Sequence, residues 1–294
     1  RGLSPSITLG PRRILPLSLI AHHHPEVIIS TLEKQLKAQR PGRHDAHFAV
    51  ATGLASPAAQ GLRAQEQTLL QRLGSGTVSL DALLQSAPEK VLLDGLVARG
   101  LVHLCGITPS DALHVLGLQG QWNAEAARMG FELCARRKDG AGRVIAASAA
   151  ELAEAVVARL TRQSAEAVLA TCLAEDGGEP IDPSTSPAVD RALRRTPGIV
   201  GMSIALDRPL VGLGASAALY YPAVARMLGA ESVVPADADV ANAIGAVVGE
   251  VRAVVSVVVS ISGEGGFVIS GAGENRLASE EAEAICQARQ RARA

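Results

Sequence analysis

The stretch "LVGLGAS" at residues 210–216 places two glycines between two different apolar patterns. A short apolar run leads into Gly212 and Gly214, and the helical pattern "AALYYPAVARML" follows Ser216. Glycine in a strand-to-helix turn lets the backbone approach a ligand closely, and free N–H groups at the helix start can bind an anion or the edge of a nucleotide ring. The same glycines can also make a tight corner. The spacing alone therefore leaves a ligand-binding turn and a structural turn open.

More specific nucleotide and hydrolase motifs do not occur in the sequence. Ala217 stands where a G-x-G-x-x-G motif needs its third glycine, and no Walker Lys-Ser/Thr pair follows. There is no G-x-S-x-G around a serine nucleophile. Asp237 and Asp239 are close in sequence, but they precede a predicted helix, where capping explains them. The residues therefore assign no catalytic group.

Histidines are the residues that could hold a metal, and three of them, His22, His23 and His24, are consecutive. Neighbouring residues of an extended segment point to opposite faces, and no carboxylate or cysteine stands at a familiar ligand spacing. We expect this run to be a solvated helix start and predict no metal site. His44 and His47 lie in a polar loop that the sequence does not place beside the run.

Two further histidines, His103 and His114, fall in segments that we expect to face the core. A structural, hydrogen-bonded role is the better interpretation for both. The four cysteines are far apart in sequence and form no C-x-x-C pair, so we expect reduced, buried thiols rather than a zinc site or disulfides at Cys105, Cys134, Cys172 and Cys286.

The composition is that of a packed globular protein with a core of small residues. The chain has 294 residues, of which 48% are hydrophobic and only 2% aromatic. Its formal net charge of -1 gives no general reason to bind nucleic acid or an anionic membrane. The apolar stretch "AVVSVVVSI" is shorter than the ~20 residues of a spanning helix, and no signal peptide is visible. We expect a soluble, cytoplasmic protein.

The first part of the chain, residues 1–61, reads as strands followed by one helix. Residues 7–20, "ITLGPRRILPLSLI", are broken by glycine and prolines, which favours extended segments. Pro25 then begins a helix with Ile28, Leu32 and Leu36 on one face. Residues 51–61, "ATGLASPAAQG", resemble a loop.

Residues 62–105 have the element order of a winged-helix module, namely helix, strand, helix, helix and strand. Such modules often bind DNA. Here four basic residues meet four acidic ones, and the helix that would enter the groove carries Glu89 and Asp94. Contacts to phosphate are therefore weakly supported, and we expect a structural insertion.

Three clear start signals make residues 106–174 a helical region. Thr108 precedes Pro109 and Asp111, a capping pattern, and further helices are predicted from Asn123 and from about Ser148 to Ala174. Residues 175–187, "EDGGEPIDPSTSP", are the clearest linker in the chain.

The remainder reads as an α/β lobe over residues 188–250 and a small module over residues 251–294. We expect strands in "PGIVGMSIAL", "PLVGLG" and "SVV", then a helix from about Val240 that is apolar on all sides and so belongs in the interior. A hairpin turning at residues 263–266 precedes a final helix with an acidic first turn and a basic last turn.

Three stretches together resemble the hydantoinase/oxoprolinase family, in particular its A-type subunits, within the sugar kinase, heat-shock ATPase and actin superfamily. They are "GPRRILPLSLIA", "GITPSDALHVLG" and "PLVGLGASAALYYPAVARMLGAESVVPADADVANAIGAVVGEV". The similarity covers nearly the entire chain. It implies an RNase H-like α/β lobe, with the winged-helix-like and helical regions as insertions and the C-terminal hairpin and helix as an addition.

In that superfamily ATP lies between two lobes, and a late glycine turn contacts the adenosine. The resemblance places this cofactor-binding role on seven residues, Gly212, Gly214, Ala215, Ser216, Pro235, Asn242 and Gly245. It implies ATP and Mg²⁺ as cofactors. The sequence contains no phosphate-binding hairpin of the D-x-G-G-T-x-T-D kind, so we expect a C-terminal fragment that is inactive alone.

The implied activity is ATP-dependent opening of a cyclic amide, such as a hydantoin or 5-oxoproline, after phosphorylation of its carbonyl oxygen. The implied partners are the small substrate and a second hydantoinase-type subunit or further copies of the chain. Two alternatives stay open: a related ATP-dependent ketone carboxylase subunit, and a non-catalytic scaffold or binding protein with the same fold.

Overall fold

The computed structural model describes residues 14–53, 61–177, 182–249, 255–262, 265–271 and 273–293. The backbone contacts divide the chain into two compact units, one ending at Asp239 and the other beginning at Val240. Helices and three separate sheets occur among these residues. The predicted α/β class is therefore confirmed.

The first unit is built on a four-stranded mixed sheet in the order β1-β4-β2-β3. β1 is parallel to β4, whereas β2 is antiparallel to both β4 and β3. The strands are β1 (Ile14–Pro16), β2 (Phe48–Ala51), β3 (Thr77–Ser79) and β4 (Val102–Gly106). β2 was not predicted, and it lies in the centre of the sheet. The two strands of the winged-helix-like region thus pair with a strand that precedes this region in the chain.

Alternate residues of the strands enter two different hydrophobic clusters, one on each face of the sheet. Phe48 and Cys105 belong to the first cluster, and their neighbours Ala49 and Leu104 to the second. This is the two-residue period of a sheet buried on both sides. His103 is exposed instead of facing the core, so that prediction was wrong.

The winged-helix-like helices cover the second face. They are α3 (Ala64–Leu73), α4 (Leu80–Leu83) and α5 (Glu89–Ala98), and the predicted order of elements over residues 62–105 is confirmed. Leu69, Leu83 and Leu96 fill the cluster beneath them. The Ser79 side chain accepts a hydrogen bond from the Ala82 N–H and so caps α4.

The opposite face carries α1 (Leu17–His23), α2 (Pro25–Lys37) and α7 (Ala124–Ala135). α2 begins at Pro25 and buries Ile28 and Leu32, as predicted. Residues 17–20 were expected to be extended, and this was wrong, because they form α1. The carboxylate of Asp111, far along the chain, accepts hydrogen bonds from the Leu17 and Ser18 N–H groups at 3.2 and 2.7 Å. A cap from outside the helix therefore starts α1.

The three predicted helix starts of the helical region are confirmed. Thr108 and Asp111 form a capping box at α6 (Pro109–Val115). The side chains of Asn123 and Ser148 accept hydrogen bonds at the starts of α7 and α8 (Ala149–Glu175). Each cap satisfies N–H groups that the first helical turn leaves free.

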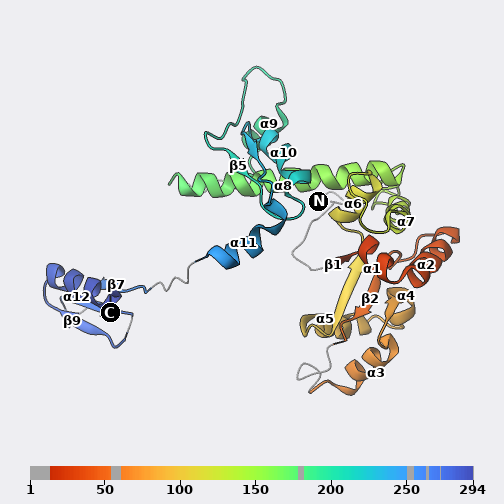
Figure 1. Cartoon of the computed structure of the whole chain (residues 1–294), viewed down its shortest axis with the longest axis horizontal. Coiled ribbons are helices and arrows are strands. Elements are labelled where there is room, and N and C mark those ends of the chain that lie inside the picture. The colour runs from red at the N-terminus through yellow and green to blue at the C-terminus, as the bar shows by residue number, and fades with distance from the viewer. Residues whose placement is uncertain are drawn as a thin grey trace. The chain divides into compact units, whose positions relative to one another are not determined.

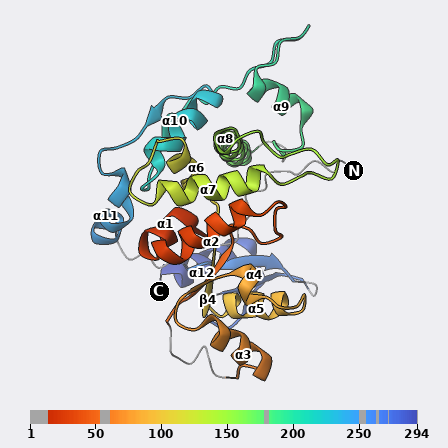
Figure 2. The same ribbon diagram turned by 90° about the vertical axis from the view of Figure 1, so that its right-hand side faces the viewer.

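The long helix α8 connects two parts of the first unit, as Figures 1 and 2 show. Its N-terminal half packs on α6 and α7 through Leu152 and Val156. Its C-terminal half packs through Leu169 on α9 (Pro187–Arg194) and α10 (Ala217–Met227). α9 was not predicted, although Ser186 caps it and Pro187 opens it.

The second unit combines α11 (Ala241–Val248) with a three-stranded antiparallel sheet and a helix. Its other elements are β7 (Val258–Ile261), β8 (Phe267–Ser270), β9 (Arg276–Ala278) and α12 (Glu281–Arg293). The predicted hairpin is confirmed as β7 and β8, and Ile269, Ala284 and Ala288 form the core. The prediction that α11 belongs in the interior was wrong, because none of its residues is buried. An apolar composition favours burial of a helix, but it does not determine whether another element packs against that helix.

No helix in the described ranges is long and apolar enough to cross a membrane.

Candidate functional site

The glycine turn lies at the carboxyl end of a two-stranded parallel sheet in the first unit. β5 (Leu210–Val211) pairs with β6 (Ser232–Val233). The Gly212 N–H then donates to the Val233 carbonyl at 2.9 Å, which extends this pairing into the turn. The predicted strand, turn and helix around residues 210–227 are confirmed.

A strand expected in residues 197–206 is not formed, so this prediction was wrong. The Leu206 N–H donates to the Leu228 carbonyl, at the end of α10, with an N···O distance of 3.1 Å. Ile199 is fully exposed. The segment thus lies along the end of a helix, where it has no neighbouring strand with which to pair.

The two glycines of the turn are required for different reasons. Gly212 is buried, and a Cβ at this position would lie 3.0 Å from the Tyr221 ring. Gly214 has a φ of +112°, and a Cβ there would meet no heavy atom within 4 Å. Gly212 therefore allows close packing, whereas Gly214 allows a backbone conformation that side chains rarely permit, on a side that is open.

The start of α10 is exposed beside this open glycine. Ala215 and Ser216 are exposed, and the Ser216 side chain makes no capping hydrogen bond. The Gly214 N–H donates to the Ala238 carbonyl at 2.6 Å, and the Ala238 N–H to the Pro235 carbonyl at 3.1 Å. The structure thus brings together five of the seven residues assigned to the cofactor.

The other two, Asn242 and Gly245, belong to the second unit. Both are exposed residues of α11.

The groups at the turn suit a neutral, hydrogen-bonding ligand part better than a metal-bound polyphosphate. They offer one hydroxyl that caps no helix and small side chains, whereas the N–H groups of Gly212 and Gly214 already donate to backbone carbonyls. Burial raises the pKa of Tyr220, on the first turns of α10, to about 12, so this phenol stays protonated at neutral pH. Within the described ranges no group of three or more His, Cys, Asp or Glu residues could hold a metal ion. The turn does not itself provide the oxygen ligands that a Mg²⁺ site needs.

Comparisons with protein-family models, curated proteins and solved structures find no match. The resemblance to the hydantoinase/oxoprolinase family therefore depends on the motifs of this chain, and the function is a proposal argued from them and from the geometry of the turn.

The histidines do not assemble into a site. His22, His23 and His24 are exposed at the junction of α1 and α2, as expected for a solvated helix start. His114 is buried: its Nδ1 donates to the Ser110 carbonyl at 2.8 Å, and its Nε2 accepts the Trp122 N–H at 3.2 Å. Both ring nitrogens thus have a hydrogen-bond partner, which confirms the structural role.

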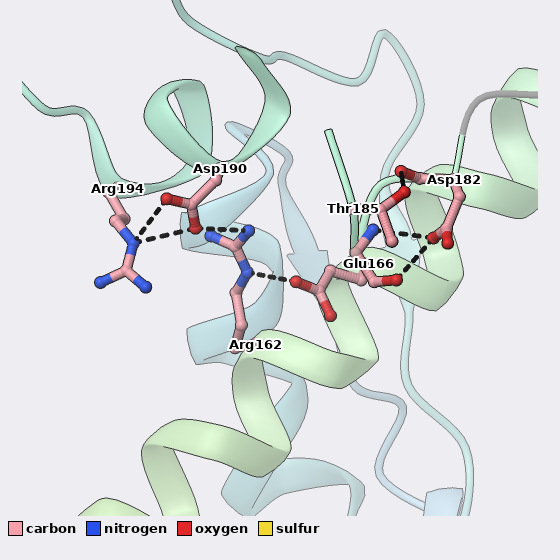
Figure 3. Close-up of polar contacts among 7 residues, drawn as sticks. Arg162, Glu166, Asp182, Thr185, Asp190 and Arg194 are labelled. Carbon is pink, nitrogen blue, oxygen red and sulfur yellow. Dashed lines mark hydrogen bonds and ion pairs between the residues drawn. The ribbon is translucent and has the colours of Figure 1, made fainter. Parts of the chain in front are cut away.

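An ion-pair network between α8 and α9 was missed by sequence reasoning. The Arg162 guanidinium lies between Glu166, at 2.6 Å from Nε, and Asp190, at 3.0 Å from Nη2, and Arg194 also binds Asp190 (Figure 3). The hydrogen bond from Arg194 lowers the pKa of Asp190. Both carboxylates are occupied by arginine, so the network joins helices rather than transferring protons. The i, i+4 spacing of Arg162 and Glu166 was the available signal.

Proposed function

We propose that this chain supplies the adenosine side of a nucleotide site in an ATP-dependent protein of the hydantoinase/oxoprolinase type, within an RNase H-like lobe. The observation that carries the proposal is the open Gly214 turn. It follows a parallel strand at its carboxyl end and leads into the exposed start of α10. Ligands of open α/β sheets bind outside the carboxyl ends of the strands.

In this proposal each residue of the turn has a limited task. The backbone at Gly214 and Ala215 approaches the adenosine, and the Ser216 hydroxyl offers it a hydrogen bond. Gly212 keeps Tyr221 against the turn, because its missing side chain leaves room for the ring. Orienting the nucleotide in this way lowers the entropic cost of the later transfer.

Bound ATP would supply the phosphoryl group that activates the carbonyl carbon of a cyclic amide, with ADP released, and Mg²⁺ would neutralise the phosphates. One water would then open the C–N bond, and a second would release inorganic phosphate. The residues described here bind and orient only the nucleoside end. The remaining groups must come from outside the turn, from elsewhere in the protein or from a partner.

The test introduces a large side chain at the turn without straining the backbone. Ala215→Phe changes an exposed residue beside Gly214, and Ala167→Phe makes the same change at an exposed position of α8. We expect Ala215→Phe to weaken binding of ATP by about tenfold or more in calorimetric titrations with Mg²⁺ present. Ala167→Phe should bind ATP like the unmodified protein.

Equal ATP affinity in all three proteins would reject the site. Gly214→Val is a poorer choice, because φ of +112° makes any side chain at this position strained whether or not a ligand is bound. Once the remaining groups are supplied by the rest of the protein or by a partner, ADP release with hydantoin or 5-oxoproline present separates an enzyme from a scaffold, since a scaffold binds ATP without substrate-dependent turnover.

A further inference from the structure

A pocket far from the glycine turn in sequence is lined mainly by cations. It lies between the segment that follows α2 and the segment that follows α7, and it has a volume of about 640 Å³. Its lining consists of Gln39, Arg40, Pro41, Gly42, Arg43, Arg137 and Lys138. Four of these seven residues are basic and none is acidic. We call it the basic pocket.

The cations that line the basic pocket form no ion pair with the carboxylates of Asp45 and Asp81, which lie beside Gly42. None of the ion pairs among the described residues includes a residue of this pocket; their cations are Arg72, Lys90, Arg128, Arg143, Arg162 and Arg194. Arg40, Arg43 and Lys138 are exposed. Cations that line a concavity without carboxylate partners concentrate a positive potential there, although the whole chain is nearly neutral.

Arg137 adds a buried donor that has no acceptor. Its Nη2 donates to the carbonyls of Arg43 and Asp45 at 3.4 and 3.1 Å, but its Nε is buried without a hydrogen-bond partner. Leaving a buried donor of a charged group unsatisfied costs free energy. Because this Nε is shielded from solvent, it does not itself reach a ligand in the pocket, and Arg137 contributes to the pocket through its positive charge.

Of the cations that line the basic pocket, only Arg137 uses its charged group in the contacts that hold the loop in place. Arg136 donates to the carbonyls of Leu36 and Ala38 at 2.8 and 2.7 Å, at the end of α2. The buried carboxylate of Asp45 accepts the Gly42 N–H at 2.7 Å, so this acid supports the loop backbone. A site that is formed in advance loses little entropy when a ligand binds.

We propose that the basic pocket binds the phosphate group of a small phosphorylated molecule. Arginine heads present paired N–H donors that match phosphate oxygens, and lysine adds a point charge. Arg43 also lines an adjoining pocket of about 270 Å³, whose other walls include Leu84 and Ala87. That second pocket has the size and partly apolar walls for a compact organic group attached to the phosphate.

Pyrophosphate is the probe, because it carries phosphate without adenosine and so does not test the glycine turn. Arg40→Gln/Lys138→Gln removes two charges of the basic pocket, and Lys34→Gln/Lys37→Gln removes two exposed charges of α2 outside it. In calorimetric titrations at constant ionic strength, we expect saturable binding that the first double variant weakens about tenfold or more. The α2 double variant should retain the affinity of the unmodified protein.

Three results of the titrations would overturn the proposal: no saturable binding of pyrophosphate, equal weakening by both double variants, or displacement of pyrophosphate by chloride as effectively as by phosphate. Retention of duplex DNA that both variants reduce equally would also overturn it, since it would show spread surface charge rather than a pocket. Glycerol 3-phosphate that binds more tightly than inorganic phosphate would support a ligand with an organic part. Ala215→Phe should leave pyrophosphate binding unchanged, which separates this proposal from the nucleotide site.

Discussion

The carboxylate of Asp111 holds the first turns of two helices. It caps α6, in which it lies, through the Thr108 N–H at 2.8 Å, and it also accepts the Leu17 and Ser18 N–H groups of α1. Its side chain is fully buried. The sequence pattern predicted the first contact, because capping of α6 spans three residues. The second joins residues more than ninety positions apart and has no local signal.

His47 is the histidine whose titration should affect stability. Burial lowers its pKa below the ordinary value of 6.5, although the carbonyl of Asp45, 2.8 Å from Nδ1, works in the opposite direction. The positive charges of Arg137 and His44 lower the pKa further, and Asp81 raises it. The neutral imidazole is thus favoured by folding, and the unfolded chain binds the proton more readily.

The free energy of unfolding should therefore fall as the pH decreases from about 7 to about 5, because only the unfolded state gains the proton over part of this range. His47→Gln should reduce this slope, and His103→Gln, at an exposed position of β4, should leave it unchanged. Urea unfolding at several pH values measures the pH dependence of the free energy of unfolding for both variants. A slope that is the same in all three proteins would exclude His47 as the cause.

The helix α8 joins elements of the first unit. An ion pair on this helix can be compared with a similar but more exposed ion pair on α7. Arg162 and Glu166 form an i, i+4 pair with side chains only 13% and 11% exposed. Arg128 and Glu132, on α7, form the same kind of pair at 55% and 46% exposure. A carboxylate that loses its partner away from water is much more costly than one in solvent.

Arg162→Met should lower the free energy of unfolding by about 2 kcal/mol or more, because Glu166 is then left without its cation. Arg128→Met should cost about 0.5 kcal/mol or less. Arginine and methionine have similar helix propensities, so the comparison isolates the ion pair. Chemical denaturation measures both values, and equal losses would contradict a stabilising role of the α8–α9 network.

At the scale of the whole molecule, each unit has a hydrophobic core of its own. Ile269, fully buried on β8, belongs to the core of the second unit, whereas Ile261, on β7, is 83% exposed. The clusters of the first unit contain only residues that precede Val240. Separate cores predict separate local stabilities.

Ile269→Val should raise hydrogen exchange about fivefold in the amides of β7, β8, β9 and α12, since such a buried truncation costs about 1 kcal/mol. Amides of α6, α7 and α8 should keep their exchange rates. Ile261→Val is the control and should change neither unit. Exchange that rises equally in both units would show one cooperative core instead of two.

Local signals in the sequence determined where most helices begin, the winged-helix-like order of elements, the hairpin and the glycine turn. Caps, prolines and glycines act over a few residues, so their effect can be predicted from the sequence alone. Signals also existed for α9, where they were short and lay at the end of a strong linker signal, and for the pair of Arg162 and Glu166 within the predicted long helix.

Only the tertiary structure decided that β2 lies in the centre of the sheet, that α1 is a helix and that α11 has no buried residue. It also decided that Arg40 and Arg43 share a pocket with Arg137 and Lys138. These outcomes depend on residues that are distant in the chain. Tertiary packing gives a strand its partner, provides a cap from another helix and brings several charges into one pocket. Neither the composition nor the spacing of the sequence specifies these contacts.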